Sequence, residues 1–186
     1  MRQARRVAVF GRADVQAGSE DYEQARQMGG LLARAGVVVI TGGYGGVMEA
    51  ASLGATEAGG EAEGVVCRAF EGRSPNPYLT RLRWTENLFE RTQILIEHAD
   101  GYVALAPRTG TLSEVVTIWA HFKAGHLSRR PLVLVGRPWE QLFSAMADTG
   151  VVEQDLLNWS IIAADVGEAA ASLTDWTTST GMVHDG

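Results

Sequence analysis

The chain has 186 residues, of which 46% are hydrophobic and 20% are charged, and this composition fits one folded domain rather than a disordered protein. Its 16 basic and 22 acidic residues give a formal net charge of −6, which excludes a broad basic surface for nucleic acid. Because Cys67 is the single cysteine, disulfide frameworks and multi-cysteine metal sites are also excluded.

The start of the chain predicts neither a signal peptide nor a membrane anchor. It is basic, and the apolar run 7–10 that follows is far too short to be a secretory or membrane-spanning segment. We therefore expect a cytoplasmic protein with no membrane partner.

The first third of the chain alternates between buried strands and helices. Short, continuous apolar runs at 7–10, 37–40 and 63–67 are typical of strands that are buried on both faces. An acidic helix start at 19–22, followed by apolar residues at helical spacing, predicts a helix that ends near Gly36. A second helix is predicted from Val47 to about residue 59.

The pattern then lapses between residues 68 and 83, where glycine and two prolines indicate a long loop. Beyond it, helices are predicted at 86–98, 111–123 and 139–148, and strands at 102–105 and 132–135, with a short apolar run at 161–163. Residues 177–186 are predicted to form a flexible C-terminal tail.

This alternation predicts an α/β fold: a Rossmann-like, doubly wound, mainly parallel sheet with helices on both faces, in one domain over residues 1–176. Ligands of such sheets bind beyond the carboxyl ends of the strands. Two unusual loops are predicted there, one after the strand 37–40 and one after the strand 102–105.

The first loop is rich in glycine and joins a buried strand to a helix. Its four glycines, Gly42, Gly43, Gly45 and Gly46, would let the backbone approach an anion at the N-terminus of the next helix. A tight turn with close packing explains them equally well. A Walker-type phosphate loop is absent, because the only lysine, Lys123, does not follow a glycine.

The second loop leads into the predicted helix 111–123. Gly110 and Thr111 stand where a phosphate would meet the N-terminus of that helix, and Glu114 follows about one turn later. A structural alternative is that Glu114 complements the helix dipole or forms a capping box with Thr111.

Three segments in this order, 41–50, 90–91 and 110–114, resemble the three signatures of the LOG (Lonely Guy) family. Members of that family are phosphoribohydrolases of cytokinin nucleotides and nucleoside 5′-monophosphates. The similarity runs from about residue 7 to residue 135. It implies a homodimer that hydrolyses an N-glycosidic bond to a free base and ribose 5-phosphate, and we expect no metal and no bound cofactor.

The resemblance assigns catalytic roles to Arg91 and Glu114. A fixed carboxylate can stabilise an oxocarbenium-like transition state and orient water, and a guanidinium can hold a phosphate or a departing base. Alternatively, Arg91 is a surface residue paired with Glu86 or Glu90. The substrate- and phosphate-binding candidates are Gly42, Gly43, Gly45, Gly46, Met48, Glu49, Arg108, Thr109, Gly110 and Thr111.

The chain also departs from the family pattern. Ala106, Pro107 and Arg108 stand where the family has Pro-Gly-Gly, and Thr92 replaces a lysine. Pro107 removes a backbone donor and Arg108 adds a bulky cation, so either Arg108 contacts the anion or the pocket is reshaped. A second hypothesis is therefore a non-catalytic carrier or sensor of a phosphorylated ligand, such as molybdenum cofactor or a nucleotide.

Four further residues carry weaker signals. Trp84, beside the long loop, is a candidate for stacking on a base, whereas the spacing of Trp119 favours the core or a subunit interface. His121 and His126 near a helix end fit charge interactions with that end better than a metal site.

Overall fold

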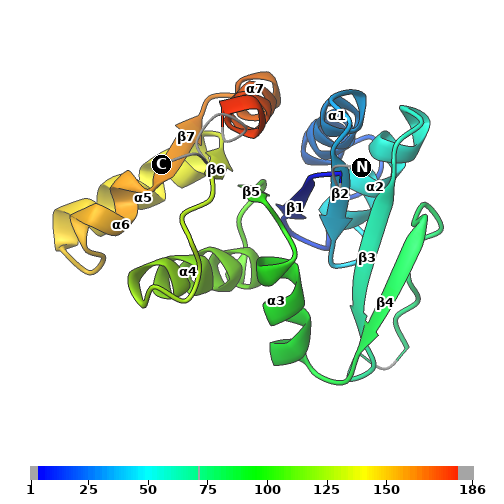
Figure 1. The fold of residues 1–186 in the computed structure, drawn as a ribbon, viewed down its shortest axis with the longest axis horizontal. Helices are drawn as coiled ribbons and strands as arrows, with labels where there is room; N and C mark the ends of the chain where they lie inside the picture. The colour runs from blue at the N-terminus through cyan, green and yellow to red at the C-terminus, as the bar shows by residue number, and fades with distance from the viewer. Residues whose placement is uncertain (1–3, 71, 180–186) are drawn as a thin grey trace, which may run out of the picture.

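Seven parallel strands in the order β4-β3-β2-β1-β5-β6-β7 form the centre of the molecule (Figure 1). The structure is a computed structural model that describes residues 4–70 and 72–179. The strands are β1 (Arg6–Phe10), β2 (Val38–Thr41), β3 (Ala62–Cys67), β4 (Arg81–Thr85), β5 (Gly101–Ala104), β6 (Leu132–Val135) and β7 (Ser160–Ala163). The predicted Rossmann-like sheet is confirmed.

The strand order reverses at β1. From β1 the chain moves outward through β2 and β3 to β4, and then returns to place β5 on the other side of β1, with Val7 opposite Gly101 and Phe10 opposite Ala104. The connections after β1 and β5 therefore leave in opposite directions. Such a reversal opens a crevice at the carboxyl ends of the two strands.

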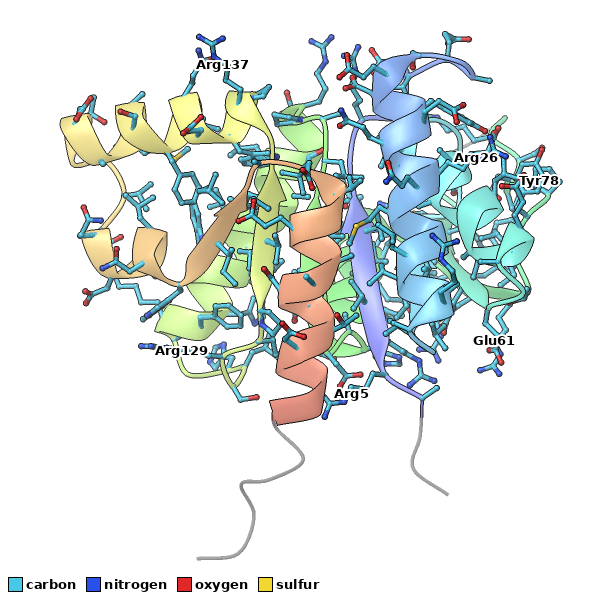
Figure 2. The ribbon with its side chains drawn as sticks, turned by 90° about the horizontal axis from the view of Figure 1, so that it is seen from above. Arg5, Arg26, Glu61, Tyr78, Arg129 and Arg137 are labelled. Carbon is cyan, nitrogen blue, oxygen red and sulfur yellow. The ribbon has the colours of Figure 1, made fainter. Side chains whose placement is uncertain are left out.

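Helices cover both faces of the sheet, as Figures 1 and 2 show. One face lies under α1 (Glu20–Arg34), α2 (Val47–Glu57) and α7 (Val166–Ser179). The other lies under α3 (Leu88–Glu97), α4 (Thr109–Lys123), α5 (Arg137–Thr149) and α6 (Gln154–Asn158). None of the helices in the described residues is long and apolar enough to span a bilayer.

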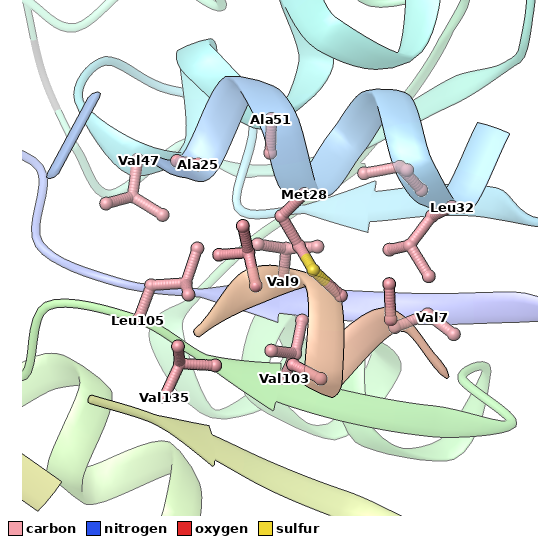
Figure 3. Close-up of a cluster of buried hydrophobic side chains, with 14 of the residues drawn as sticks. Val7, Val9, Ala25, Met28, Leu32, Val47, Ala51, Val103, Leu105 and Val135 are labelled. Carbon is pink, nitrogen blue, oxygen red and sulfur yellow. The ribbon is translucent and has the colours of Figure 1, made fainter. Parts of the chain in front are cut away.

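The core beneath α1 depends on alternation along the strands. Val7 and Val9 of β1 point to the same face and pack against Met28 and Leu32 of α1, while Val103 of β5 joins them (Figure 3). The intervening residues of the buried strands point to the opposite face and pack under α3 and α4.

Helices α1 and α2 approach closely because each carries a glycine that faces the backbone of the other helix. A Cβ atom on Gly29 would lie 2.0 Å from the carbonyl oxygen of Ala51, and one on Gly54 would lie 1.8 Å from that of Arg26. Any side chain here would push the two helices apart.

The edge of the sheet and the C-terminal region differ from the prediction. Residues 81–85 form the edge strand β4, whereas residues 68–83 were predicted to be loop. The residues 81–84 are exposed and alternate between arginine and apolar side chains, so they lack the continuous apolar run of a buried strand. Helices α6 and α7 were not predicted. The predicted tail begins too early, because residues 177–179 belong to α7, and the rest of it, residues 180–186, lies outside the described residues.

We predict that Gly29→Ala destabilises the protein by about 2 kcal/mol, because overpacking between α1 and α2 outweighs the better helix propensity of alanine. Thermal denaturation of the variant measures the effect. Gln27→Ala, an exposed position on the same helix, is the matched control and should change stability by less than about 0.5 kcal/mol. Equal stabilities of the two variants would contradict the close helix contact.

Candidate functional site

A cavity of about 440 Å³ lies at the carboxyl ends of the strands, where the strand order reverses. This volume is in the usual range for a small-molecule site. Its lining comes from the loops after β1, β3 and β5, from the glycine-rich turn after β2, and from α2, α3 and α4. The residues are Gly11, Arg12, Ala13, Tyr44, Met48, Phe70, Arg73, Leu88, Arg91, Thr92, Arg108, Thr109, Gly110, Thr111, Ser113 and Glu114.

Arg91 on α3 extends beneath the sheet edge instead of into solvent. The residue is only 6% exposed, and its Nε donates to the carbonyl oxygen of Val65 at 2.8 Å. Its Cζ lies 5.8 Å from the ring centre of Tyr44 and 5.9 Å from that of Phe70. A buried guanidinium thus has a backbone acceptor and two aromatic rings as partners.

The alternative of a surface ion pair for Arg91 is wrong. Glu86 instead accepts from Arg68 at 3.1 Å, and the carboxylate of Glu90 accepts from the backbone N–H of Glu86 at 2.8 Å. Among the described residues, Arg91 has no carboxylate within ion-pair distance.

The glycine-rich turn makes room for Arg91. A Cβ atom on Gly42 would lie 1.6 Å from Nη2 of that arginine, which in turn lies 3.7 Å from Sδ of Met48. Gly43 packs on Val66 with a φ of +77°. Tight packing therefore accounts for these glycines.

The remaining candidates between residues 42 and 49 lie at different places relative to the cavity. Gly46 packs on the backbone of the β1 loop with a φ of +69°, and Gly45 borders a shallow neighbouring pocket. The carboxylate of Glu49 accepts from the hydroxyl of Tyr22 at 3.0 Å. Of the candidates between residues 42 and 49, Met48 is the one that lines the cavity, together with Tyr44, which sequence reasoning had not named.

Among the described residues that line the cavity, Glu114 is the only one with a carboxylate. It is half-buried, and burial raises its pKa to about 7 although the charge of Arg91 lowers it. Burial likewise lowers the pKa of Arg91, and Glu114 opposes that shift. The two side chains are therefore electrostatically coupled, and near neutral pH Glu114 exists in both protonation states.

Helix α4 presents its N-terminus to the same cavity. It begins at Thr109, two residues earlier than predicted, and its N-cap Arg108 provides no side-chain cap. Since the N–H of Leu112 is the first to bond back into the helix, to the carbonyl oxygen of Arg108, the three preceding amides keep no intrahelical acceptor.

The capping-box alternative for Thr111 and Glu114 is wrong. The Thr111 hydroxyl is buried and has no hydrogen-bond partner within the described part of the chain. Thr111 is one of the cavity-lining residues, and its own amide is one of the three free amides at the start of α4. Together the hydroxyl and these amides form a donor group suited to an anion.

The divergent loop before α4 sits at the mouth of the cavity. Ala106 has a φ of +37°, and its carbonyl oxygen accepts from the N–H of Arg12 at 3.3 Å. The Arg108 side chain is 61% exposed, and its Nη2 lies 3.9 Å from the carboxylate of Asp14. Asp14 also accepts two hydrogen bonds from Arg12, at 2.6 and 3.0 Å, which lower its pKa to about 2. One exposed carboxylate is thus shared by two arginines.

The sequence of residues 4–151 matches the family model described as the SLOG cluster4 family. The chain belongs to the SLOG cluster4 family. This agrees with the LOG-like motifs that line the cavity or pack beside it.

Two relatives are named cytokinin riboside 5′-monophosphate phosphoribohydrolase. The one from Mycobacterium marinum is 28% identical and aligns over 75% of this chain and 77% of its own. The one from Mycobacterium tuberculosis is 27% identical, over 81% and 84%.

Two solved structures with the same fold are named for a different function, which concerns molybdenum cofactor. The molybdenum cofactor binding protein from Rippkaea orientalis matches with a TM-score of 0.76 and 25% identity, over 94% of this chain and 98% of its own. The molybdenum cofactor carrier protein from Chlamydomonas reinhardtii matches with a TM-score of 0.74 and 26% identity, over 95% and 99%. Family membership is thus compatible with both catalysis and transport of a ligand.

Several weaker candidates lie away from the cavity. Trp84 is 44% exposed on β4, and the guanidinium of Arg68 lies 5.1 Å above its ring. Trp119 belongs to the core, where its Nε1 donates to Ser160 Oγ at 2.9 Å. The rings of His121 and His126 lie 5.8 Å apart near the C-terminus of α4. Phe70, which does line the cavity, gave no sequence signal because it stands in an irregular loop.

We predict that Asp14→Asn tightens the binding of inorganic phosphate by about two- to fivefold, because Arg12 and Arg108 lose a competing carboxylate. Isothermal titration calorimetry measures the change. Asp21→Asn is a graded control, since Asp21 lies 3.7 Å from Arg12 and contributes less to that competition. Weaker phosphate binding by the Asp14 variant would show that Asp14 supports the anion site.

A second prediction concerns pH. Because the pKa of Glu114 is about 7 in the folded protein and near 4.5 when the chain is unfolded, the folded state binds the extra proton, and stability falls as pH rises between these values. Glu114→Gln should remove this loss, which is on the order of 2 to 3 kcal/mol. Melting curves of both proteins at pH 5 and pH 8 test it, and parallel pH profiles would contradict the raised pKa.

Proposed function

We propose that this protein hydrolyses the N-glycosidic bond of a nucleoside 5′-monophosphate and releases a free base and ribose 5-phosphate. The observation that carries the proposal is that Glu114, with its pKa of about 7, shares one cavity with the N-terminus of α4, whose first three amides have no intrahelical acceptor. The names of the mycobacterial relatives support it, and AMP-like or cytokinin nucleotides are the substrates that the resemblance suggests.

In this proposal the phosphate binds at the N-terminus of α4. The free amides of Thr109, Gly110 and Thr111, together with the Thr111 hydroxyl, donate to its oxygens. Arg108 and Arg12, at the mouth, add charge-assisted hydrogen bonds. This local arrangement lets a protein with a net charge of −6 hold an anion.

Glu114 and Arg91 would then act on the ribose and the base. As the bond between C1′ and the base nitrogen breaks, its electron pair leaves with the base, and positive charge develops on the sugar. The ionised Glu114 stabilises that charge and accepts a proton from the water that adds to C1′. The departing base takes up a proton from solvent, and Glu114 releases its own proton to solvent afterwards, so that one water is consumed overall. Arg91 serves as a substrate clamp.

The residues of the glycine-rich turn act indirectly in this scheme. Gly42 leaves space for the Arg91 guanidinium, and Met48 contacts it. Gly43, Gly45, Gly46 and Glu49 hold the turn and α2 in place around it, so we propose positioning roles for them rather than direct binding of the phosphate.

We further propose a cytoplasmic homodimer, as the resemblance to the LOG family suggests. Helix α3 carries two exposed apolar residues beside the cavity, Phe89 at 88% exposure and Leu88 at 49%. Val116 on α4 is 44% exposed. Large apolar side chains on a surface are the usual mark of an interaction site, and a second copy would cover them.

A carrier of a phosphorylated ligand is the second candidate. It is favoured by Pro107 and Arg108, which replace two glycines of the family pattern, and by the likeness to molybdenum cofactor carriers along almost the whole chain. Such a protein would bind molybdenum cofactor or a nucleotide through the same donors and leave it intact.

Incubation with a panel of nucleoside 5′-monophosphates tests the proposed hydrolysis. We expect wild type to release free base and Glu114→Gln to be at least about 100-fold slower, the usual cost of removing an electrostatic catalytic group. Glu140→Gln, an exposed glutamate on α5, is the control and should keep full activity. If nucleotides raise the melting temperature but are recovered intact from wild type, the carrier is the better description.

A further inference from the structure

The polar side chains of the cavity are mostly hydrogen-bond donors. Four arginines line it, against the single carboxylate of Glu114, and its lining includes no asparagine, glutamine or histidine among the described residues. The Tyr44 hydroxyl faces away, because it donates to the carbonyl oxygen of Cys67 at 3.0 Å and accepts from its N–H at 2.8 Å. Such a lining favours a ligand with hydrogen-bond acceptors at its edge.

Three of the four arginines already have partners. Arg91 bonds to the Val65 carbonyl oxygen, Arg12 forms a double hydrogen bond with Asp14, and Arg108 lies beside the same carboxylate. Arg73 differs, because it forms no ion pair with any residue that the structure describes.

Arg73 is nevertheless held in place by stacking. Its Cζ lies 5.2 Å from the ring centre of Phe70, which itself meets Tyr44 edge-on at 5.6 Å. A guanidinium that stacks on an aromatic ring keeps its N–H edge free to donate in the plane. The exposed Arg73 thus offers the cavity N–H donors that form no ion pair with a described residue.

The strand order separates Arg73 from the N-terminus of α4, although Arg73 also borders a second pocket together with Ala13 and Asp14 near the cavity mouth. The loop with Arg73 follows β3, and the N-terminus of α4 follows β5, which is three strands away in the sheet. Three strand spacings amount to about 14 Å. A nucleotide with its phosphate at α4 would therefore extend its base toward Arg73, over the apolar surfaces of Met48, Phe70 and Leu88.

We propose that Arg73 reads the base and that the cavity prefers a purine with a carbonyl oxygen at C6, as in hypoxanthine or guanine, over adenine. O6 and N7 of such a base accept two parallel hydrogen bonds from one guanidinium. Adenine presents an amino group at the same place, and its N–H donors would face the donors of Arg73. The inference rests on the proposed nucleotide binding and departs from an adenine-type substrate.

The test compares inosine and adenosine 5′-monophosphates, which differ at this edge of the base. Calorimetric titration in the Glu114→Gln background keeps both nucleotides intact. We expect inosine monophosphate to bind about tenfold more tightly. Arg73→Gln should abolish or reverse the preference, because a glutamine amide pairs with N6 and N7 of adenine.

Arg68→Gln is the matched control. Arg68 belongs to the same β3–β4 connection and also stacks on an aromatic ring, that of Trp84, but it does not line the cavity. Its substitution should leave both dissociation constants unchanged. Equal affinities for the two nucleotides, or a preference that survives Arg73→Gln, would overturn the role of Arg73 alone. Failure of the Glu114→Gln protein to bind either nucleotide would overturn nucleotide binding itself.

Discussion

The burial of one positive charge organises this site. Removal of a guanidinium from water costs several kcal/mol unless hydrogen bonds and nearby charges compensate for it. Arg91 obtains this compensation from the carbonyl oxygen of Val65, from the rings of Tyr44 and Phe70, and from the field of Glu114. Gly42 in the glycine-rich turn leaves the space that this group occupies, and burial raises the pKa of the neighbouring Glu114.

The sheet topology decides where these groups meet. Because the chain leaves β1 in one direction and returns to its other side at β5, the loops after the two strands diverge and the cavity opens between them. The backbone contact between Arg12 and Ala106 joins the two loops at the rim. Motifs that are far apart in sequence, such as the start of α3 and the start of α4, thereby contribute to one wall.

Local patterns in the sequence were sufficient to predict the buried strands and to locate the motifs around Gly42, Arg91 and Glu114. They were not sufficient where tertiary packing decides the outcome. The edge strand β4 lacks an apolar run, and Phe70, Arg73 and Asp14 stand in loops whose paths are fixed by contacts rather than by periodicity. The sequence left open whether the glycine-rich turn binds an anion or packs tightly, because the packing depends on the position of a guanidinium from another helix.

The shared position of Asp14 between Arg12 and Arg108 gives the cavity mouth an internal anion. A ligand that binds to these arginines would replace that carboxylate. The net gain in interaction free energy would then be the difference between the energies of the arginines with the ligand and with Asp14. A ligand with one negative charge would replace a group of equal charge and gain little interaction energy, whereas a phosphate dianion brings one additional negative charge. If the ligand binds to these arginines, the mouth would therefore favour ligands of higher negative charge.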